Sequence, residues 1–152
     1  MKNYILFILS TCLAILTNAQ SGTLSEKEGK LYLNNSLYSG IQKITDNENV
    51  ISEYTIVDGL KDGKITHFYG NKKIKEIGYY SKNEKDGAWE KWDNNGNKIG
   101  EAHYKNGIKE GSWIVWDKNG IKRYEMFYEN GNKVGTWKVW NDNGLLTQEK
   151  QF

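Results

Sequence analysis

The sequence predicts an all-β protein, built as an elongated single-sheet antiparallel meander of β-hairpins with a 24-residue period. Three observations support this fold class. Glycines and large aromatic residues recur at matching positions through most of the chain. Segments of about six to eight residues, rich in Trp, Tyr, Ile and Val, alternate with turn signals such as Asn-Gly, which is typical of strands. Proline is absent from the whole chain, as a continuous hydrogen-bonded ladder favours.

The layout of residues 1–19 predicts a secretory signal peptide that is cleaved before Gln20. It contains one lysine, then an apolar run, and ends on the small residue Ala19. The apolar run is shorter than the roughly 20 residues that a membrane-spanning helix needs. The alternative is a lipoprotein lipidated at Cys12, and membrane association is expected only in that case. The preferred localisation is therefore secreted or periplasmic.

Composition excludes several classes of function. Cys12 is the only cysteine, so cleavage after Ala19 would leave no disulfide, thiol nucleophile or thiolate metal site. The net charge is only +2, and charges of opposite sign alternate along the chain. A nucleic-acid partner is therefore not expected, because such proteins carry a basic patch.

Two segments follow the signal peptide. Residues 20–36 are an N-terminal lead-in segment, and residues 37–152 are the repeat domain, with about five hairpin repeats of which the first is degenerate. Its glycine, Gly40, lies 23 residues before Gly63, one short of the period. Turn glycines then mark each repeat, either two residues before an isoleucine or tryptophan or in Asn-Gly pairs. They are Gly63, Gly87, Gly107, Gly111, Gly131 and Gly135.

The segments "YKNGIKEGSWIVWDKNG" and "YENGNKVGTWKVWNDNG" resemble MORN-variant repeats, the bacterial form of the MORN motif, found in many proteins labelled as a toxin–antitoxin antitoxin family. The resemblance extends roughly from Leu37 to Phe152. It implies β-hairpin repeats. For function it implies less, because MORN-type repeats occur as scaffolds, as membrane-associated segments and as appendages to enzymes.

The two tryptophans of each repeat are expected on opposite faces of the sheet, because side chains alternate along a strand. One face should carry a structural ladder of stacked rings. Its members are Trp89, Trp113, Trp137, Tyr80, Tyr104 and Tyr128. The other face is the candidate binding face, since Glu90 and Lys138 make it more polar. Its aromatic residues are Phe68, Trp92, Trp116 and Trp140.

No constellation of catalytic or metal-binding residues emerges. His67 and His103 occupy different positions of the repeat and are interpreted as isolated surface residues. The recurring acids Asp62, Asp86 and Glu110 precede the repeat glycines and are attributed to the turns. With no paired nucleophile and base, the sequence predicts no enzyme, no catalytic residues, no metal and no cofactor.

The leading functional hypothesis is an exported, non-enzymatic protein-binding or scaffold module of the bacterial cell envelope. Its partner is expected to be another protein, bound by a sheet face or an edge strand. The alternative is binding of glycan or cell wall through exposed Trp and Tyr rows. A third hypothesis, an antitoxin-type partner of a toxin, is discounted because an exported protein does not meet a cytoplasmic toxin.

Overall fold

The computed structural model describes residues 22–47 and 49–152; the predicted signal peptide, Cys12 and Gln20 lie outside them. Every regular element in the described part is a β-strand, and this part holds no helix able to cross a membrane. The strands are β1 (Leu24–Lys27), β2 (Lys30–Leu33), β3 (Ser36–Leu37), β4 (Gly40–Asp46), β5 (Asn49–Val57), β6 (Leu60–Phe68), β7 (Ile74–Ser81), β8 (Glu84–Lys85), β9 (Gly87–Trp92), β10 (Lys98–Lys105), β11 (Ile108–Lys109), β12 (Gly111–Trp116), β13 (Lys122–Glu129), β14 (Asn132–Trp140) and β15 (Leu146–Gln151).

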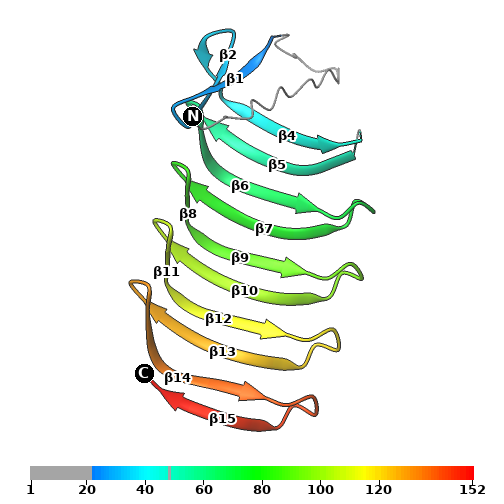
Figure 1. The fold of residues 1–152 in the computed structure, drawn as a ribbon, viewed down its shortest axis with the longest axis vertical. Helices are drawn as coiled ribbons and strands as arrows, with labels where there is room; N and C mark the ends of the chain where they lie inside the picture. Colours follow the sequence, from blue (N-terminus) through cyan, green and yellow to red (C-terminus); the bar gives the residue numbers. More distant parts are fainter. Residues whose placement is uncertain (1–21, 48) are drawn as a thin grey trace, which may run out of the picture.

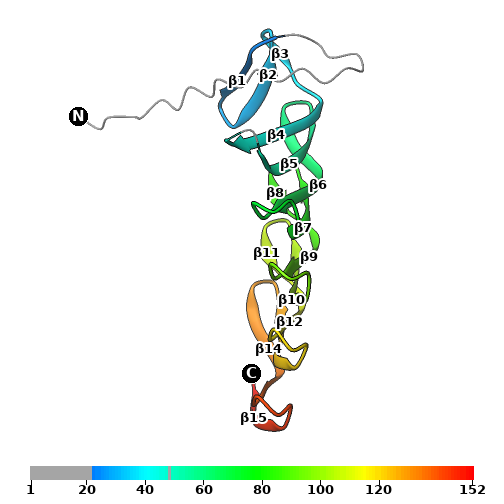
Figure 2. The same cartoon turned by 90° about the vertical axis from the view of Figure 1, so that its right-hand side faces the viewer.

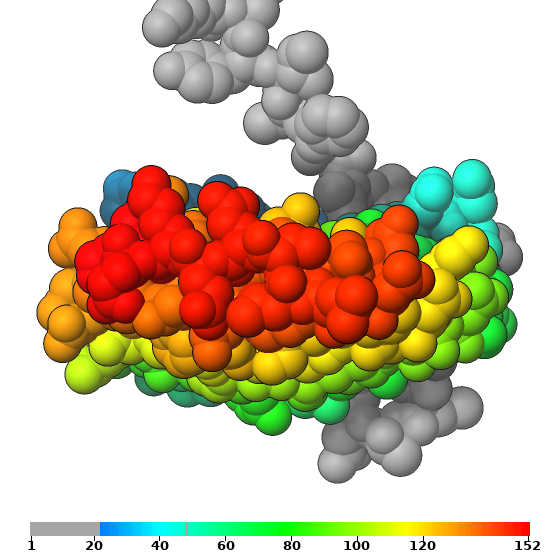
Figure 3. Space-filling model, turned by 90° about the horizontal axis from the view of Figure 1, so that it is seen from below, coloured from blue at the N-terminus to red at the C-terminus, as the bar shows by residue number. Residues whose placement is uncertain are grey.

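Among the described strands, 12 form one antiparallel sheet in the order β15-β14-β13-β12-β10-β9-β7-β6-β5-β4, with β8 and β11 added to β7 and β10. Apart from the short strands β8 and β11, strands that follow one another in the chain are neighbours in the sheet, so the hairpins stack into an elongated array (Figure 1). Viewed from its edge, the array is a single layer (Figure 2). Viewed along its length, it is wider along the strands than across them (Figure 3). The predicted all-β array of hairpins is confirmed.

Tight two-residue turns close the hairpins at one end of the strands, and the two turns at 106–107 and 130–131 are Asn-Gly pairs. Asn106 and Gly107 have φ values of 48° and 77°. Two successive positive φ values define a type I′ turn, whose second position favours glycine. The Gly107 N–H donates a hydrogen bond of 2.8 Å to the Lys85 carbonyl oxygen of the preceding repeat. The six predicted turn glycines all have positive φ: Gly63 (113°), Gly87 (73°), Gly107 (77°), Gly111 (69°), Gly131 (81°) and Gly135 (65°).

Acidic side chains also tie two of the tight turns to the preceding repeat. The Asp86 carboxylate accepts a hydrogen bond of 3.2 Å from the Asn106 N–H. One repeat later, Glu110 accepts one of 2.8 Å from the Asn130 N–H. Asp86 and Glu110, which precede repeat glycines, therefore stabilise the turns, because their carboxylates satisfy backbone donors that face outward there.

The lead-in segment contains a structure that has no counterpart in the repeat pattern. Strands β1, β2 and β3 form a separate three-stranded antiparallel sheet, which we call the cap. The Leu31 N–H donates to the Gly59 carbonyl oxygen (2.8 Å), and the Gly59 N–H donates to the Tyr38 carbonyl oxygen (2.7 Å). The Asn83 side chain donates to the Gly29 carbonyl oxygen (3.1 Å). The cap is therefore attached to the first two tight turns of the array.

Burial is greatest near the cap and decreases along the array. Ile56 and Ile65 are 1 % exposed, Trp89 is 4 % exposed, and Leu31 of the cap is 9 % exposed. The last strand, β15, is exposed along its whole length. A single-layer sheet has no second sheet to form a core, and its most buried side chains lie toward the end of the array that carries the cap.

Candidate functional site

Aromatic rings form a continuous ladder on one face of the sheet. Neighbouring ring centres lie 4.7–6.0 Å apart, mostly in T-shaped or tilted arrangements. Such pairs contribute roughly 0.5–1.5 kcal/mol beyond the area they bury. The series is Tyr80, Trp89, Tyr104, Trp113, Tyr128, Trp137 and Phe152. The structure thus brings all six predicted ladder residues together, and we call this side the ladder face.

The indole nitrogens hold the ladder tryptophans in one orientation. The Trp89 Nε1–H donates to the Tyr79 carbonyl oxygen at 3.1 Å. The Trp113 Nε1–H donates to the His103 carbonyl oxygen at 3.0 Å. Trp137 repeats the contact with the carbonyl oxygen of Phe127 at 3.1 Å. Because each buried polar edge of these rings is satisfied by the backbone, the ladder acts as framework.

A column of lysines covers the ladder, and the sequence analysis did not identify it. Each ammonium group lies over two rings of the ladder face, at 3.7–5.6 Å from the ring centres, which is cation–π geometry. The lysines recur with the same 24-residue period as the tryptophans, so the signal was present in the sequence. They are Lys61, Lys85, Lys109 and Lys133.

The reverse face of the sheet carries the second tryptophan column. The Lys98 ammonium donates to Glu101 at 2.6 Å and also to Glu90, and it lies 5.6 Å from the ring centre of Trp116. Burial opposes the charge of Lys98, but its hydrogen bonds to Glu101 and Glu90 outweigh burial and raise its pKa. Lys122 similarly lies 5.1 Å from the Trp140 ring centre. This face is therefore a mixed layer of tryptophans and ion pairs.

The four candidate binding residues are all half-buried. Trp116 and Trp140 each have a lysine over the ring. Strand alternation places Trp92 on the same reverse face, and Phe68 begins the column in the first full repeat. The structure thus assembles these residues into one column, although side chains of the same face cover part of it.

His67 is not an isolated surface residue. Its Nδ1 atom lies 2.7 Å from the Ser52 hydroxyl, its Nε2 atom lies 3.9 Å from a Glu76 oxygen, and its ring packs edge-on against Tyr54. Burial lowers the pKa of His67, while Glu76 acts in the opposite direction. Ser52 is only 7 % exposed, so its hydroxyl is closed to a substrate and we interpret the cluster as packing. The strand register produces this contact: His67 on β6 is paired with Ser52 on β5 and with Glu76 on β7.

His103 occupies a different environment, with its Nδ1 atom 3.0 Å from the Ser112 carbonyl oxygen. Among the residues that the structure describes, no group of three His, Cys, Asp or Glu side chains is arranged to hold a metal ion. The arrangement offers contact surfaces, formed by aromatic rings, lysines and carboxylates.

Comparison with known families agrees with this geometry. The family model described as MORN repeat variant matches residues 61–82, 85–106 and 109–132, which are three consecutive repeats. Each match runs from one tight turn to the next along a hairpin of the array. No curated protein matches the chain. MORN repeats are generally modules that bind proteins or membranes. Residues 61–132 therefore contain three consecutive MORN repeats of the variant type.

Proposed function

We propose that this protein is an exported, non-enzymatic binding module of the bacterial cell envelope, which binds another protein through the C-terminal half of its ladder face. The observation that carries this proposal is an apolar row across three neighbouring strands, in which Val115 and Tyr124 are exposed and Val139 is half-buried. Val115 lies opposite Tyr124, and Tyr124 lies opposite Val139. Val115 is 37 % exposed and Tyr124 is 45 % exposed.

The position of the row favours a protein partner. The cap lies against the N-terminal end of the array, and the row begins beyond it, on β12, β13 and β14. Contiguous apolar surface on a folded protein marks contact sites. Tyrosine is among the residues that contribute most to protein interfaces, because its large rigid ring buries much area at low entropic cost. The Trp113 and Trp137 rings, which adjoin the row on the ladder face, are fixed by their indole hydrogen bonds, so this part of the surface is rigid before binding.

Export is supported by the layout of residues 1–19, which matches a secretory signal peptide. The partner is therefore expected outside the cytoplasm. Cell fractionation with mass spectrometry of the native product tests this part separately, and the expected mature protein begins at Gln20. An unprocessed Met1 in the cytoplasmic fraction would contradict it.

Site-specific photo-crosslinking tests the binding surface. A photoreactive phenylalanine derivative replaces Tyr124 in the full-length protein, produced in its own bacterium, and the control carries the same group at Glu125. These neighbours point to opposite faces of β13. We expect one defined crosslinked protein from position 124 and none from position 125, and we expect Val115→Asp to abolish the crosslink. Equal products from both positions, or none from position 124, would contradict the proposal.

A further inference from the structure

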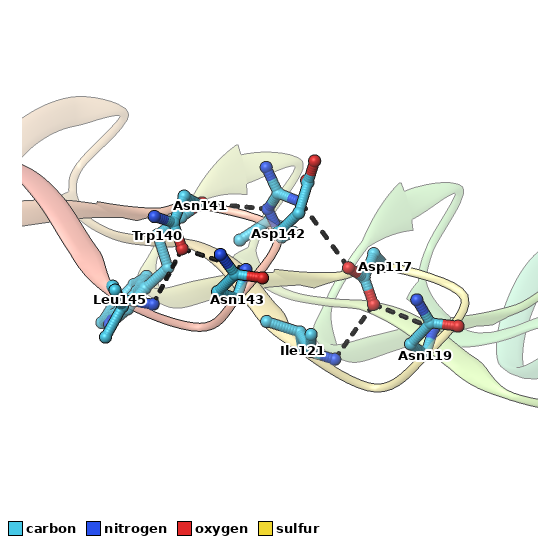
Figure 4. A network of polar contacts seen from close by, with 9 residues as sticks. Asp117, Asn119, Ile121, Trp140, Asn141, Asp142, Asn143 and Leu145 are labelled. Carbon is cyan, nitrogen blue, oxygen red and sulfur yellow. Dashed lines mark hydrogen bonds and ion pairs between the residues drawn. The ribbon is translucent and has the colours of Figure 1, made fainter.

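Wide loops close the hairpins at the end opposite the tight turns. They span residues 69–73, 93–97, 117–121 and 141–145, and in each the first N–H donates to the last carbonyl oxygen at 2.8–2.9 Å. Inside the loops, the Asp117 carboxylate accepts hydrogen bonds from the Asn119 and Ile121 N–H groups, as the Asn141 side chain does from those of Asn143 and Leu145 (Figure 4). The four loops therefore have one conformation and stack along one side of the array.

Side chains bridge the gap between the last two loops. The Arg123 Nε–H donates to the Trp140 carbonyl oxygen at 2.9 Å, and its guanidinium pairs with Asp142 and, at 3.6 Å, with Asp117. Figure 4 shows this network linking the two loops. Burial would raise the pKa of Asp117, but hydrogen bonds from the Ile121 and Asn119 N–H groups and from Arg123 lower it.

The gap between the first two loops is bridged as well. The Tyr69 hydroxyl donates to the Trp92 carbonyl oxygen at 2.8 Å, and the Asn71 side chain donates to that of Asn94 at 2.7 Å. The Lys73 ammonium donates to the Asn95 carbonyl oxygen at 3.3 Å.

The middle gap, between loops 93–97 and 117–121, differs from its neighbours. Ile99 stands one period before Arg123, and Lys118 stands one period before Asp142, so both halves of the bridging ion pair are replaced. Within the described residues, no hydrogen bond or ion pair links these two loops. A shallow hollow of about 380 Å³, open to solvent, lies there instead. Its lining residues are Asn97, Lys98, Trp116, Lys118, Asn119 and Gly120.

The lining defines the chemistry of a ligand. The Trp116 indole borders the hollow, and the amides of Asn97 and Asn119 can hydrogen-bond to hydroxyl groups. The charge of Lys98 is offset by Glu90 and Glu101. Lys118 makes no ion pair within the described part of the chain, and no carboxylate lines the hollow. The site therefore combines one aromatic surface, two amides and one uncompensated cation.

We propose that this hollow is a subsite for an acidic sugar, a pyranose that carries a carboxylate. The sugar ring packs against the Trp116 indole beside the Lys98 ammonium, which lies 5.6 Å from the ring centre. Its carboxylate pairs with Lys118, and its hydroxyls bond to the asparagine amides. One aromatic surface with a few placed polar groups is enough to orient a small ligand. This subsite lies at the loop edge of the array and does not depend on the protein-binding row of the ladder face.

The test measures binding of trigalacturonic acid to the purified protein by calorimetry, with maltotriose as a neutral trisaccharide and acetate as the anion alone. We expect saturable binding of the acidic trisaccharide only. Trp116→Ala should weaken it about tenfold or more, while Trp140→Ala, whose gap is bridged, should leave it unchanged. Equal binding of maltotriose, or no saturable binding of trigalacturonic acid, would overturn the proposal.

A second variant distinguishes loss of binding from loss of folding, because Trp116→Ala removes a large side chain and also affects stability. Ile99→Arg combined with Lys118→Asp places in the middle gap the two residues that bridge the next one. We expect this double variant to keep the melting temperature of the native protein or to raise it, and to lose binding of trigalacturonic acid. Native affinity in a folded double variant would overturn the proposal. Loss of binding here, with the Tyr124 crosslink retained, would separate the subsite from the protein-binding surface.

Discussion

The ammonium group of Lys109 lies 4.5 Å from the ring centre of Trp113 and belongs to the same repeat. It also lies 4.7 Å from the ring centre of Tyr128, so one cation contacts two neighbouring rings of the ladder. The same arrangement occurs one repeat earlier at Lys85 and one repeat later at Lys133. In a sheet without a second layer, the lysine stems and ammonium groups replace the side chains that an opposing sheet would supply.

We expect Lys109→Met to lower the free energy of unfolding by about 0.5–1 kcal/mol, because methionine keeps much of the apolar stem and removes the cation over the rings. Lys105→Met is the control, since Lys105 is exposed, and should change stability by less than about 0.5 kcal/mol. Urea unfolding followed by circular dichroism measures both. Equal free energies for the two variants would show that the cation contributes nothing to the ladder.

Gly78 gives Trp89 its close contact with the sheet. A Cβ atom at Gly78 would lie 2.3 Å from the Trp89 ring, whereas one at Gly100 would come no nearer than 3.6 Å to the Lys91 side chain. We expect Gly78→Ala to destabilise by about 1–3 kcal/mol through overpacking, and Gly100→Ala to be nearly neutral. Thermal unfolding of the two variants tests this. A melting temperature of Gly78→Ala equal to that of Gly100→Ala would mean that Trp89 moves freely.

His67 predicts a pH dependence of stability. Burial, aided by nearby lysines, lowers the pKa of the folded-state ring below the ordinary 6.5, although Glu76 opposes this. Below pH 6.5 the unfolded chain then binds more protons than the folded protein, so the free energy of unfolding falls as the pH decreases through that range. His67→Gln removes this titration. Urea unfolding at about pH 7.5 and pH 5.5 should show a smaller fall for the variant, and an equal fall would remove His67 as the cause.

The 24-residue period was sufficient to predict the hairpins, the positive φ at Gly107 and the opposite directions of paired tryptophans, because strands and tight turns are determined by local sequence. The cap was not predicted. Its attachment depends on the hydrogen bond between Leu31 and Gly59, which joins a segment outside the period to the array. The contact of His67 with Ser52 depends on register between two strands, which the period leaves undetermined where the first repeat is one residue short.

The hollow beside Trp116 was also not predicted by aligning the repeats. The sequence shows that Ile99 stands where the next repeat has Arg123. The structural consequence, a gap without a bridging ion pair, depends on how the loops stack. A search for recurring residues also favours what repeats, whereas this hollow exists because one gap does not repeat. The lysine column that includes Lys109 is different, because it recurs with the full 24-residue period. Aligning the lysines with the tryptophans would have predicted it.

The last prediction separates framework from open surface by comparing the two central tryptophans. Trp113 is held between Tyr104 and Tyr128, with ring centres 5.1 and 5.3 Å away, and its indole N–H is bonded to the His103 carbonyl oxygen. Trp116 has Lys98 over its ring at 5.6 Å and borders the hollow. We therefore expect Trp113→Ala to cost about 3–5 kcal/mol, as for large packed aromatic residues, and Trp116→Ala to cost clearly less.

Urea unfolding monitored by far-ultraviolet circular dichroism measures both variants, since tryptophan fluorescence would itself be altered. The pair Trp137→Ala and Trp140→Ala repeats the comparison one repeat later. There the difference should be smaller, because Arg123 bonds to the Trp140 carbonyl oxygen and closes the gap beside that ring. If Trp116→Ala destabilises the protein as much as Trp113→Ala does, the reverse-face tryptophans are framework too, and the aromatic columns offer no open ring to a ligand.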